Sequence, residues 1–91
     1  MKFQLGRVVA TAGVDRWMKS SPVNVGFVAN SITRHSQGDW GDVCDDDKQL
    51  NNQALEHGDR VLSSYSHSDT KIWVITECDR SCTTILFPEE Y

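Results

Sequence analysis

The spacing of apolar residues predicts a strand followed by helical segments at the start of the chain. Residues 2–10 alternate loosely between apolar and polar positions, and the β-branched pair Val8 and Val9 favours a strand over a helix. Between residues 14 and 19, apolar side chains recur at offsets of three and four, which indicates a short helix with one apolar side. The chain therefore begins with one strand and one helical segment.

Two longer helices follow, and each carries signals for its ends. Ser21 is a suitable N-cap, and Pro22 fits the first helical position because its missing N–H leaves no helical bond unmade. An apolar face at helical period then runs to His35. A third helix is predicted from Asp45 to His57, where carboxylates in the first turn complement the helix dipole and Gly58 provides the stop. The apolar residues of this helix that we expect to face inward are Leu50, Ala54 and Leu55.

The last third of the chain predicts three strands, over residues 60–66, 71–77 and 83–87, with a hairpin loop at residues 66–69. The second of these strands is apolar on both faces, as a central strand requires, and Pro88 ends the last one. The order β-α-α-α-β-β-β predicts an α+β fold, in which an antiparallel sheet of about four strands packs on helices from the N-terminal half. We expect residues 1–91 to form a single domain.

Composition excludes several classes of protein. The chain has 91 residues, nine Lys and Arg, and a formal net charge of −4, so nucleic acid is an unlikely partner and the charge is also too low for a DNA mimic. No apolar run is long enough for a signal peptide or a membrane span, and three cysteines cannot all pair within the chain. We therefore expect a cytoplasmic protein with no membrane contact. Its hydrophobic core is small, so the stability of the fold is marginal, and a homodimer would increase it.

The first cluster of candidate functional residues lies at the predicted end of the second long helix and in the turn that follows. Arg34, His35, Asp39 and Trp40 fall within seven residues, and two glycines bracket the last two. In a ligand pocket, Trp40 would offer a flat face, Arg34 would bind an anion, and His35 would donate a proton near neutral pH. Alternatively, His35 caps helix carbonyls, Arg34 pairs with Asp39 or Asp42, and Trp40 fills the core.

The second cluster follows the predicted central strand. Glu77 and Asp79 point to the same side of an extended chain, and together with His35 they would suit a metal-dependent hydrolase. Arg80 departs from the lysine that nucleases usually place shortly after their second acidic residue. The alternative is a bulged turn that Asp79 holds together with Arg80 and Thr83.

Other polar groupings do not have the spacing of known metal sites. The aspartates between residues 39 and 47 lack the alternate ligands of a calcium loop, so a solvated helix start explains them better. Cys78 and Cys82 are separated by three residues instead of two, no second pair accompanies them, and Cys44 stands alone. We expect no metal site and no cofactor.

Several segments spread along the chain form a distinctive set of motifs: Phe3, Leu5–Thr11, Arg34-His35, Gly38–Gly41, Asn52, Arg60, Ser63, Trp73–Ser81 and Thr83–Tyr91. These motifs resemble a family of small bacterial proteins found on plasmids, phages and other mobile elements. The resemblance runs nearly end to end and departs most between Val14 and Val28. Members carry names such as plasmid-related protein or type I restriction subunit M, although this chain is too short for a methyltransferase fold. The family is functionally uncharacterised, so the resemblance implies only an accessory protein of a mobile element.

These observations lead to three functional hypotheses. The first is a protein-interaction module of a mobile element, because the chain lacks motifs for chemistry and has aromatic residues suited to interfaces. The second is a small-molecule or anion-binding domain, and the third is a metal-dependent hydrolase; an enzyme is the less favoured class. The candidate binding residues are Arg34, His35, Asp39, Trp40, Trp73, Glu77, Asp79 and Arg80.

Overall fold

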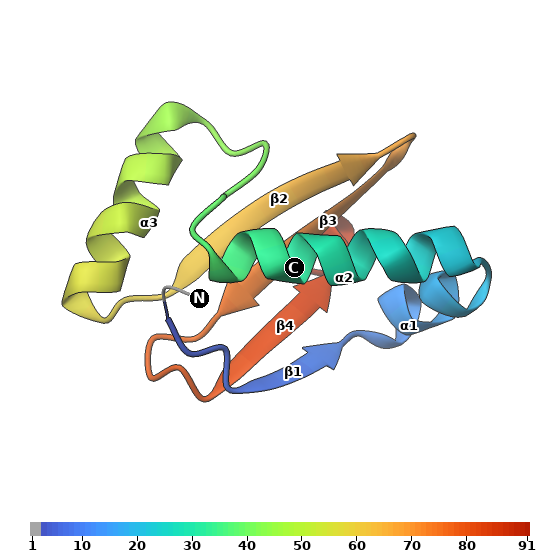
Figure 1. Ribbon diagram of the computed structural model, residues 1–91, viewed down its shortest axis with the longest axis horizontal. Helices are drawn as coiled ribbons and strands as arrows, with labels where there is room; N and C mark the ends of the chain where they lie inside the picture. Colours follow the sequence, from blue (N-terminus) through green and yellow to red (C-terminus); the bar gives the residue numbers. More distant parts are fainter. Residues whose placement is uncertain (1–2) are drawn as a thin grey trace.

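The computed structural model describes residues 3–91, which form a four-stranded sheet and three α-helices (Figure 1). This confirms the predicted α+β class and the predicted order of elements. In chain order the elements are β1 (Arg7–Ala10), α1 (Ala12–Lys19), α2 (Pro22–Ser36), α3 (Asp45–His57), β2 (Val61–His67), β3 (Thr70–Thr76), β4 (Cys82–Leu86) and the short 3-10 helix η1 (Pro88–Glu90).

The sheet is mixed, which corrects the expectation of a wholly antiparallel sheet. Its strand order is β1-β4-β3-β2, and the last three strands of the chain form the predicted antiparallel meander. β1 instead runs parallel to β4, with Arg7 opposite Cys82 and Ala10 opposite Ile85. Tight hairpins force consecutive strands to be antiparallel, whereas the long connection between β1 and the meander leaves the direction of β1 free.

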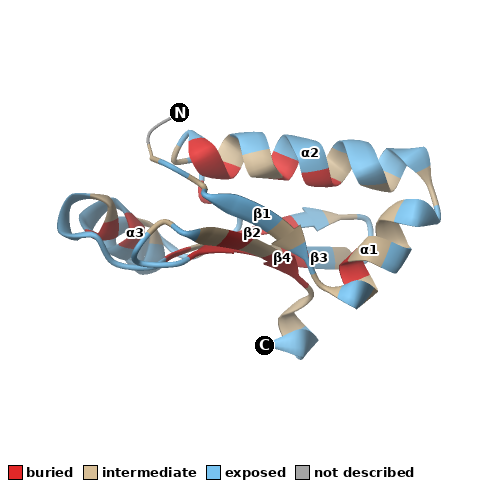
Figure 2. Cartoon of the chain, turned by 90° about the horizontal axis from the view of Figure 1, so that it is seen from below, coloured by how far each residue is buried: buried red, intermediate tan, exposed pale blue. Residues whose placement is uncertain are grey.

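The helices cover the sheet unevenly. α2 lies over one face, α1 lies at the end of β1, and α3 lies beside β2 (Figures 1 and 2). The C-terminal tail with η1 lies on the opposite face, as Figure 2 shows. We call the face under α2 the inner face and the opposite one the outer face.

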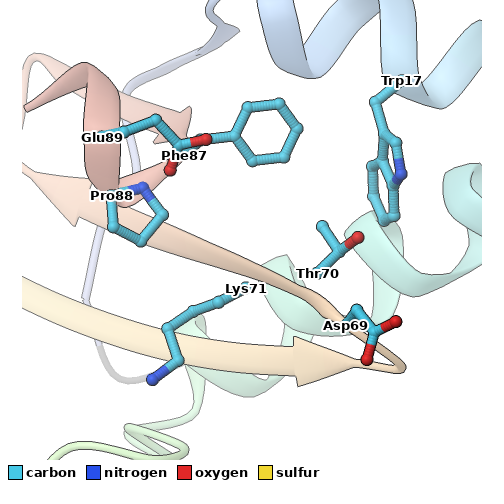
Figure 3. A pocket seen from close by; sticks show the side chains of 7 residues that line it. All are labelled: Trp17, Asp69, Thr70, Lys71, Phe87, Pro88 and Glu89. Carbon is cyan, nitrogen blue, oxygen red and sulfur yellow. The ribbon is translucent and has the colours of Figure 1, made fainter.

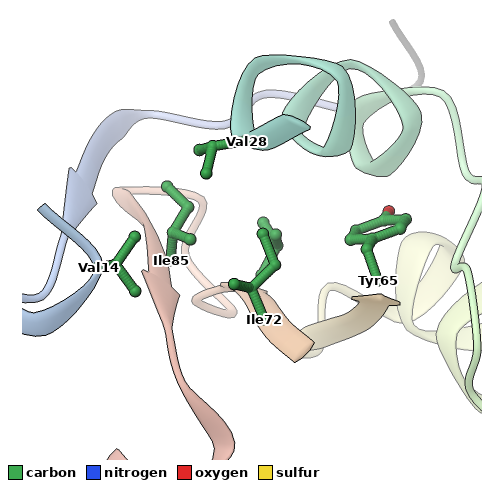
Figure 4. Close-up of a cluster of buried hydrophobic side chains, with 6 residues drawn as sticks. Val14, Val28, Tyr65, Ile72 and Ile85 are labelled. Atoms are coloured by element: carbon green, nitrogen blue, oxygen red, sulfur yellow. The ribbon is translucent and has the colours of Figure 1, made fainter. Parts of the chain in front are cut away.

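The main core lies between α1, α2 and the inner face. Figure 4 shows part of this cluster, in which side chains from both helices meet those of β2, β3 and β4. Its buried members are Val14, Val28, Tyr65, Ile72, Val74 and Ile85. A second cluster beneath α3 contains Trp40, Ala54 and Val61, against which Phe3, Val43 and Leu55 pack.

The helix boundaries follow the sequence signals closely. The Ser21 hydroxyl accepts a hydrogen bond from the backbone N–H of Val23, and Gly58 ends α3 with a φ of 76°. Leu50, however, is 60% exposed, which corrects its predicted inward position. Asn51 occupies the inward position in its place and hydrogen-bonds the backbone of β2. Because neighbouring residues of a helix are rotated by about 100° from one another, Leu50 then faces solvent. The first strand is also shorter than predicted, and residue 2 lies outside the described residues.

Two glycines offer a matched test of this fold. Gly41 has a φ of 75°, and a Cβ there would overlap the carbonyl oxygen of Ser64, whereas Gly26 lies within α2 with no neighbour within 4 Å of an added Cβ. We expect Gly41→Ala to lower the free energy of unfolding by at least about 2 kcal/mol. Gly26→Ala should raise it by about 0.5–1 kcal/mol. Chemical denaturation of both variants measures this, and a neutral Gly41→Ala would contradict the described turn.

Candidate functional site

The end of α2 and the turn after it are held by an ion pair. The Arg34 guanidinium donates to both carboxylate oxygens of Asp39, from Nε at 2.7 Å and from Nη2 at 3.2 Å, and it also lies 4.8 Å from the centre of the Tyr65 ring. The Tyr65 hydroxyl donates to the backbone oxygen of Asp39 at 2.6 Å. The hydrogen bond from Arg34 lowers the pKa of the Asp39 carboxyl. Arg34 therefore fixes the turn, as the alternative interpretation predicts.

His35 lies fully buried between α2 and the sheet. Its Nδ1 contacts the Ser63 hydroxyl of β2, and its Nε2 lies 2.8 Å from the Thr76 hydroxyl of β3. Thr76 is in turn hydrogen-bonded to Thr83 of β4 at 2.7 Å, and Thr83 donates to the backbone oxygen of Leu5. The expectation that His35 caps helix carbonyls is wrong, because the last turn of α2 lies on the sheet and the ring points into it.

The surroundings of His35 keep its imidazole neutral. Burial, and secondarily the positive charge of Arg80, lower the pKa of His35 to about 4. The ring also packs edge-on against Phe3 and Trp40, at centroid distances of 5.3 and 5.7 Å. His35 is therefore not placed to exchange protons with a ligand near neutral pH.

Trp40 is part of the fold rather than an exposed ligand platform. It is 3% exposed, and its indole N–H donates to the Asn52 side-chain oxygen at 3.0 Å. Gly38 and Gly41 on either side have φ values of 80° and 75°, as the glycine-bracketed turn predicts. The Trp40 ring is therefore buried under α3.

The two acidic residues of the second cluster do not converge with His35. Glu77 and Asp79 are both exposed, and a carboxylate oxygen of Asp79 accepts from the backbone N–H of Ser81 at 3.0 Å. This contact shapes the turn between β3 and β4. The Ser81 side chain first, and its backbone N–H second, lower the pKa of Asp79 by hydrogen bonding to the carboxylate. Thr83, which was expected to help hold this turn, belongs instead to the network around His35.

Arg80 is the central residue of that turn. It has a φ of 59°, and its guanidinium donates to the backbone oxygens of Asp59 at 2.7 Å, Glu77 at 3.1 Å and Ala54 at 3.2 Å. The guanidinium carbon also lies 5.5 Å from the centre of the Phe3 ring. Arg80 therefore ties the end of α3 to the turn between β3 and β4.

A phenyl ring occupies the space between the two clusters. Phe3 packs against His35 on one side and Arg80 on the other. Within residues 3–91, no group of three His, Cys, Asp or Glu side chains is arranged to hold a metal ion. The convergence that a hydrolase at His35, Asp39, Glu77 and Asp79 requires is thus not found in the described chain.

Two hollows of the surface lie elsewhere. One of them has a volume of about 310 Å³ and lies between α1, the β2–β3 hairpin and the tail. Figure 3 shows its lining residues, which are Trp17, Asp69, Thr70, Lys71, Phe87, Pro88 and Glu89. The Lys71 ammonium points away from the two aromatic rings there (Figure 3). The other hollow, of about 240 Å³, lies between α3 and β2 and is lined by Val43, Asp47, Leu50, Asn51, Arg60 and Leu62.

Trp73 is the one candidate residue that stands on the outer face. Its ring lies 5.5 Å from that of Tyr91, and the Arg60 guanidinium both lies 5.5 Å from the Tyr91 ring centre and donates to the Tyr91 hydroxyl at 2.6 Å. We call Trp73, Tyr91 and Arg60 the outer aromatic cluster. Alternation along β3 places Trp73 opposite the core residues of that strand, but no sequence signal brings Arg60 and the tail to it.

Comparisons with protein-family models, curated proteins and solved structures find no match. Among the described residues, no helix combines the length and apolar character needed to cross a membrane.

The buried imidazole predicts a specific dependence of stability on pH. Because the pKa of His35 is about 4 in the folded protein and about 6.5 when unfolded, the unfolded chain binds the proton more tightly. The stability that the neutral ring confers is complete above pH 6.5. We expect about 3 kcal/mol of it to be lost as the pH falls towards 4.

Denaturation at several pH values should show this loss, and His35→Asn should remove it from the same window. If that variant does not fold, NMR titration of the His35 ring in the native protein decides the question. A midpoint near pH 6.5 would contradict the described burial.

Removing the Arg80 guanidinium distinguishes a structural role from a ligand-binding one. Arg80→Ala removes three hydrogen bonds and leaves the backbone oxygen of Asp59 without its donor, so we expect it to lower the free energy of unfolding by about 1–3 kcal/mol. Glu77→Gln serves as the control, because the Glu77 side chain is exposed. Equal stability of both variants in urea denaturation would show that Arg80 is free for another role.

Proposed function

We propose that the protein is a protein-interaction module that binds its partner through the outer aromatic cluster. The observation that carries this proposal is the position of Trp73, Tyr91 and Arg60 on the sheet face that none of the three α-helices covers. Trp, Tyr and Arg are the residue types that most often dominate binding energy at interfaces, because they combine large apolar area with a polar group.

The arrangement of the cluster favours binding to a preformed surface. The Arg60–Tyr91 hydrogen bond and the Trp73–Tyr91 ring contact hold the three side chains together before a partner arrives. Tyr91 is nevertheless 64% exposed, so a large part of its ring is available for contact. Side chains ordered in advance lose less conformational entropy on binding.

The neighbouring hollow extends the same surface. Arg60 also lines the hollow between α3 and β2, next to Leu62 and to Leu50, which is 60% exposed. An apolar side chain of a partner fits this hollow, and a carboxylate beside it would pair with Arg60. The partner chemistry that fits best is therefore an apolar protein surface with an acidic group at its rim.

The alternatives receive less support from the arrangement of side chains. An anion-binding domain would use Arg34 and Arg80, yet both guanidinium groups already bond a carboxylate or backbone oxygens of the fold. His35 cannot act as a proton donor to a ligand where it lies, because its ring is buried and neutral. A hydrolase lacks converging ligands within residues 3–91.

The cellular setting of this proposal comes from the resemblance of the motifs. We propose a small cytoplasmic accessory protein of a mobile genetic element, whose partner belongs to host defence or to plasmid maintenance. A basic nucleic-acid surface is not required for such a role, which agrees with the net charge of −4.

A capture experiment with matched baits tests the proposal. Wild type, Tyr91→Ala and the control Val23→Ala are immobilised and exposed to host lysate; Val23 is 60% exposed and lies on α2, on the other side of the sheet. We expect a reproducible partner on wild type and control. Its affinity for Tyr91→Ala should be about 30-fold lower, as for a residue that dominates an interface.

Because the Tyr91 side chain is largely exposed, Tyr91→Ala should leave the melting temperature close to that of wild type. Absence of any reproducible partner would count against the proposal. Equal capture by Tyr91→Ala would place the interface elsewhere.

A further inference from the structure

The strand β1 forms an edge of the sheet with unpaired backbone groups. The N–H groups of Arg7 and Thr11 point inward and bond Ser81 and Ile85, each at 3.0 Å. Since alternate residues of a strand turn their backbone groups to opposite sides, those of Val8 and Ala10 point away from the sheet. No strand among residues 3–91 pairs with them, and Figure 1 shows β1 as the outermost strand.

The opposite edge of the sheet is blocked. The Asn51 side chain makes two hydrogen bonds with the backbone of Leu62 in β2, at 2.8 and 3.2 Å. Next along that strand, Ser64 donates to the Trp40 oxygen and accepts from the Asp42 N–H. Such devices prevent further strand pairing. They occur at β2 and leave β1 open, so the two edges differ in what they can bind.

We propose that β1 pairs in antiparallel fashion with β1 of a second copy, which joins the two sheets into one. This interface is separate from the outer aromatic cluster and does not depend on the proposed function. Edge-to-edge pairing of this kind obtains its hydrogen bonds from the main chain and its specificity from the side chains opposite one another.

The outward backbone groups define the register. The register that uses the outward groups of both residues in each copy places Val8 of one copy opposite Ala10 of the other. Val9 then lies opposite Val9 of the second copy, on the two-fold axis. Each of the two Val8–Ala10 pairs exchanges two hydrogen bonds, as in an antiparallel ladder.

The same register brings opposite charges together, which favours a second copy over an unrelated strand. Arg7 lies opposite Thr11 of the second copy, on the outer face. The Thr11 hydroxyl donates to the Glu90 carboxylate at 2.7 Å, so the Arg7 guanidinium comes beside Glu90 of the other copy. Arg7 is exposed and makes no ion pair with the described residues of its own chain. The two-fold axis forms this charge pair twice.

Exposed apolar side chains lie on the inner face near the same edge. Val8 is 43% exposed and shares the inner face with Thr83, its register partner in β4. Phe27 of α2 stacks on His67 of β2, so this flank of the helix faces β2. Val25 and Ala29 lie on the opposite flank of α2, which faces β1. Val25 is 45% exposed. Pairing of β1 would bring these apolar groups of the two copies closer together.

Sedimentation equilibrium with an edge variant tests the interface. Wild type should be a dimer, and Val8→Pro should raise the dissociation constant at least about 10-fold, because proline removes one donor from each Val8–Ala10 pair and obstructs the edge. Val8→Thr keeps the backbone groups and a β-branched side chain, and it should remain a dimer. A wild-type monomer at the highest soluble concentration would overturn the proposal.

Cysteine cross-linking tests the register even if Val8→Pro fails to fold. In a chain with Cys44→Ser, Cys78→Ser and Cys82→Ser, Val9→Cys should form a covalent dimer on mild oxidation, because residues on the axis lie within disulfide range. Ser66→Cys, which is exposed on β2, is the matched control and should stay monomeric on a denaturing gel. No cross-link at Val9, or an equal one at Ser66, would overturn the proposal.

A charge reversal tests whether the strand partner is a second copy. Arg7→Glu should weaken the dimer at low salt and lose this effect at high salt, since its carboxylate faces Glu90 of the other copy. Lys71→Glu makes the same charge change on β3 and should leave the dimer unchanged. Equal effects of both variants would refute the Arg7–Glu90 pairing and, with it, the argument for a second copy.

Discussion

The buried imidazole of His35 is the contact on which the arrangement of this fold depends. It joins α2 to β2 through Ser63 and to β3 through Thr76, and from there the network continues to Thr83 in β4. Hydroxyl groups can donate or accept, so a neutral ring is fully satisfied at this site. A charged ring would be buried near Arg80 without a counter-ion. Both the seating of α2 and the neutrality of the ring therefore follow from one desolvated network.

This network explains why the residues whose side chains are best suited to binding or catalysis do not form a site. His35 and Arg80 bond groups that are distant in sequence, and Arg34 pairs with Asp39 in the turn that follows its own helix. These bonds hold the helices and turns in place on the sheet. The same residue types would serve a pocket if their polar groups faced a cavity. Here Phe3 fills the space between the two clusters. Under the proposed function, recognition therefore uses the surfaces that the helices leave uncovered.

The sequence predicts those features that depend on neighbouring residues. Ser21, Pro22 and Gly58 mark helix ends through local capping and backbone preference, and the structure confirms them. It does not predict that β1 runs parallel to β4, or that Thr76 bonds a histidine far away along the chain. A threonine in a strand is equally compatible with either face, and pairing across many residues leaves no local signal. For the same reason, the sequence indicates only Trp73 of the outer aromatic cluster and does not predict that Arg60 and Tyr91 lie beside it.

A single helix layer on a four-stranded sheet leaves one face and at most two edges open, and the two proposed interfaces use different parts of them. A two-fold axis perpendicular to the sheet keeps the outer faces of both copies on the same side. Trp73 lies on β3, which β4 separates from β1, so the two outer aromatic clusters would stand apart without obstructing one another. A dimer would thus present two equivalent surfaces to a partner. Linked sites of this kind bind a repeated or clustered target far more tightly than one site does, because the second contact forms within the same complex.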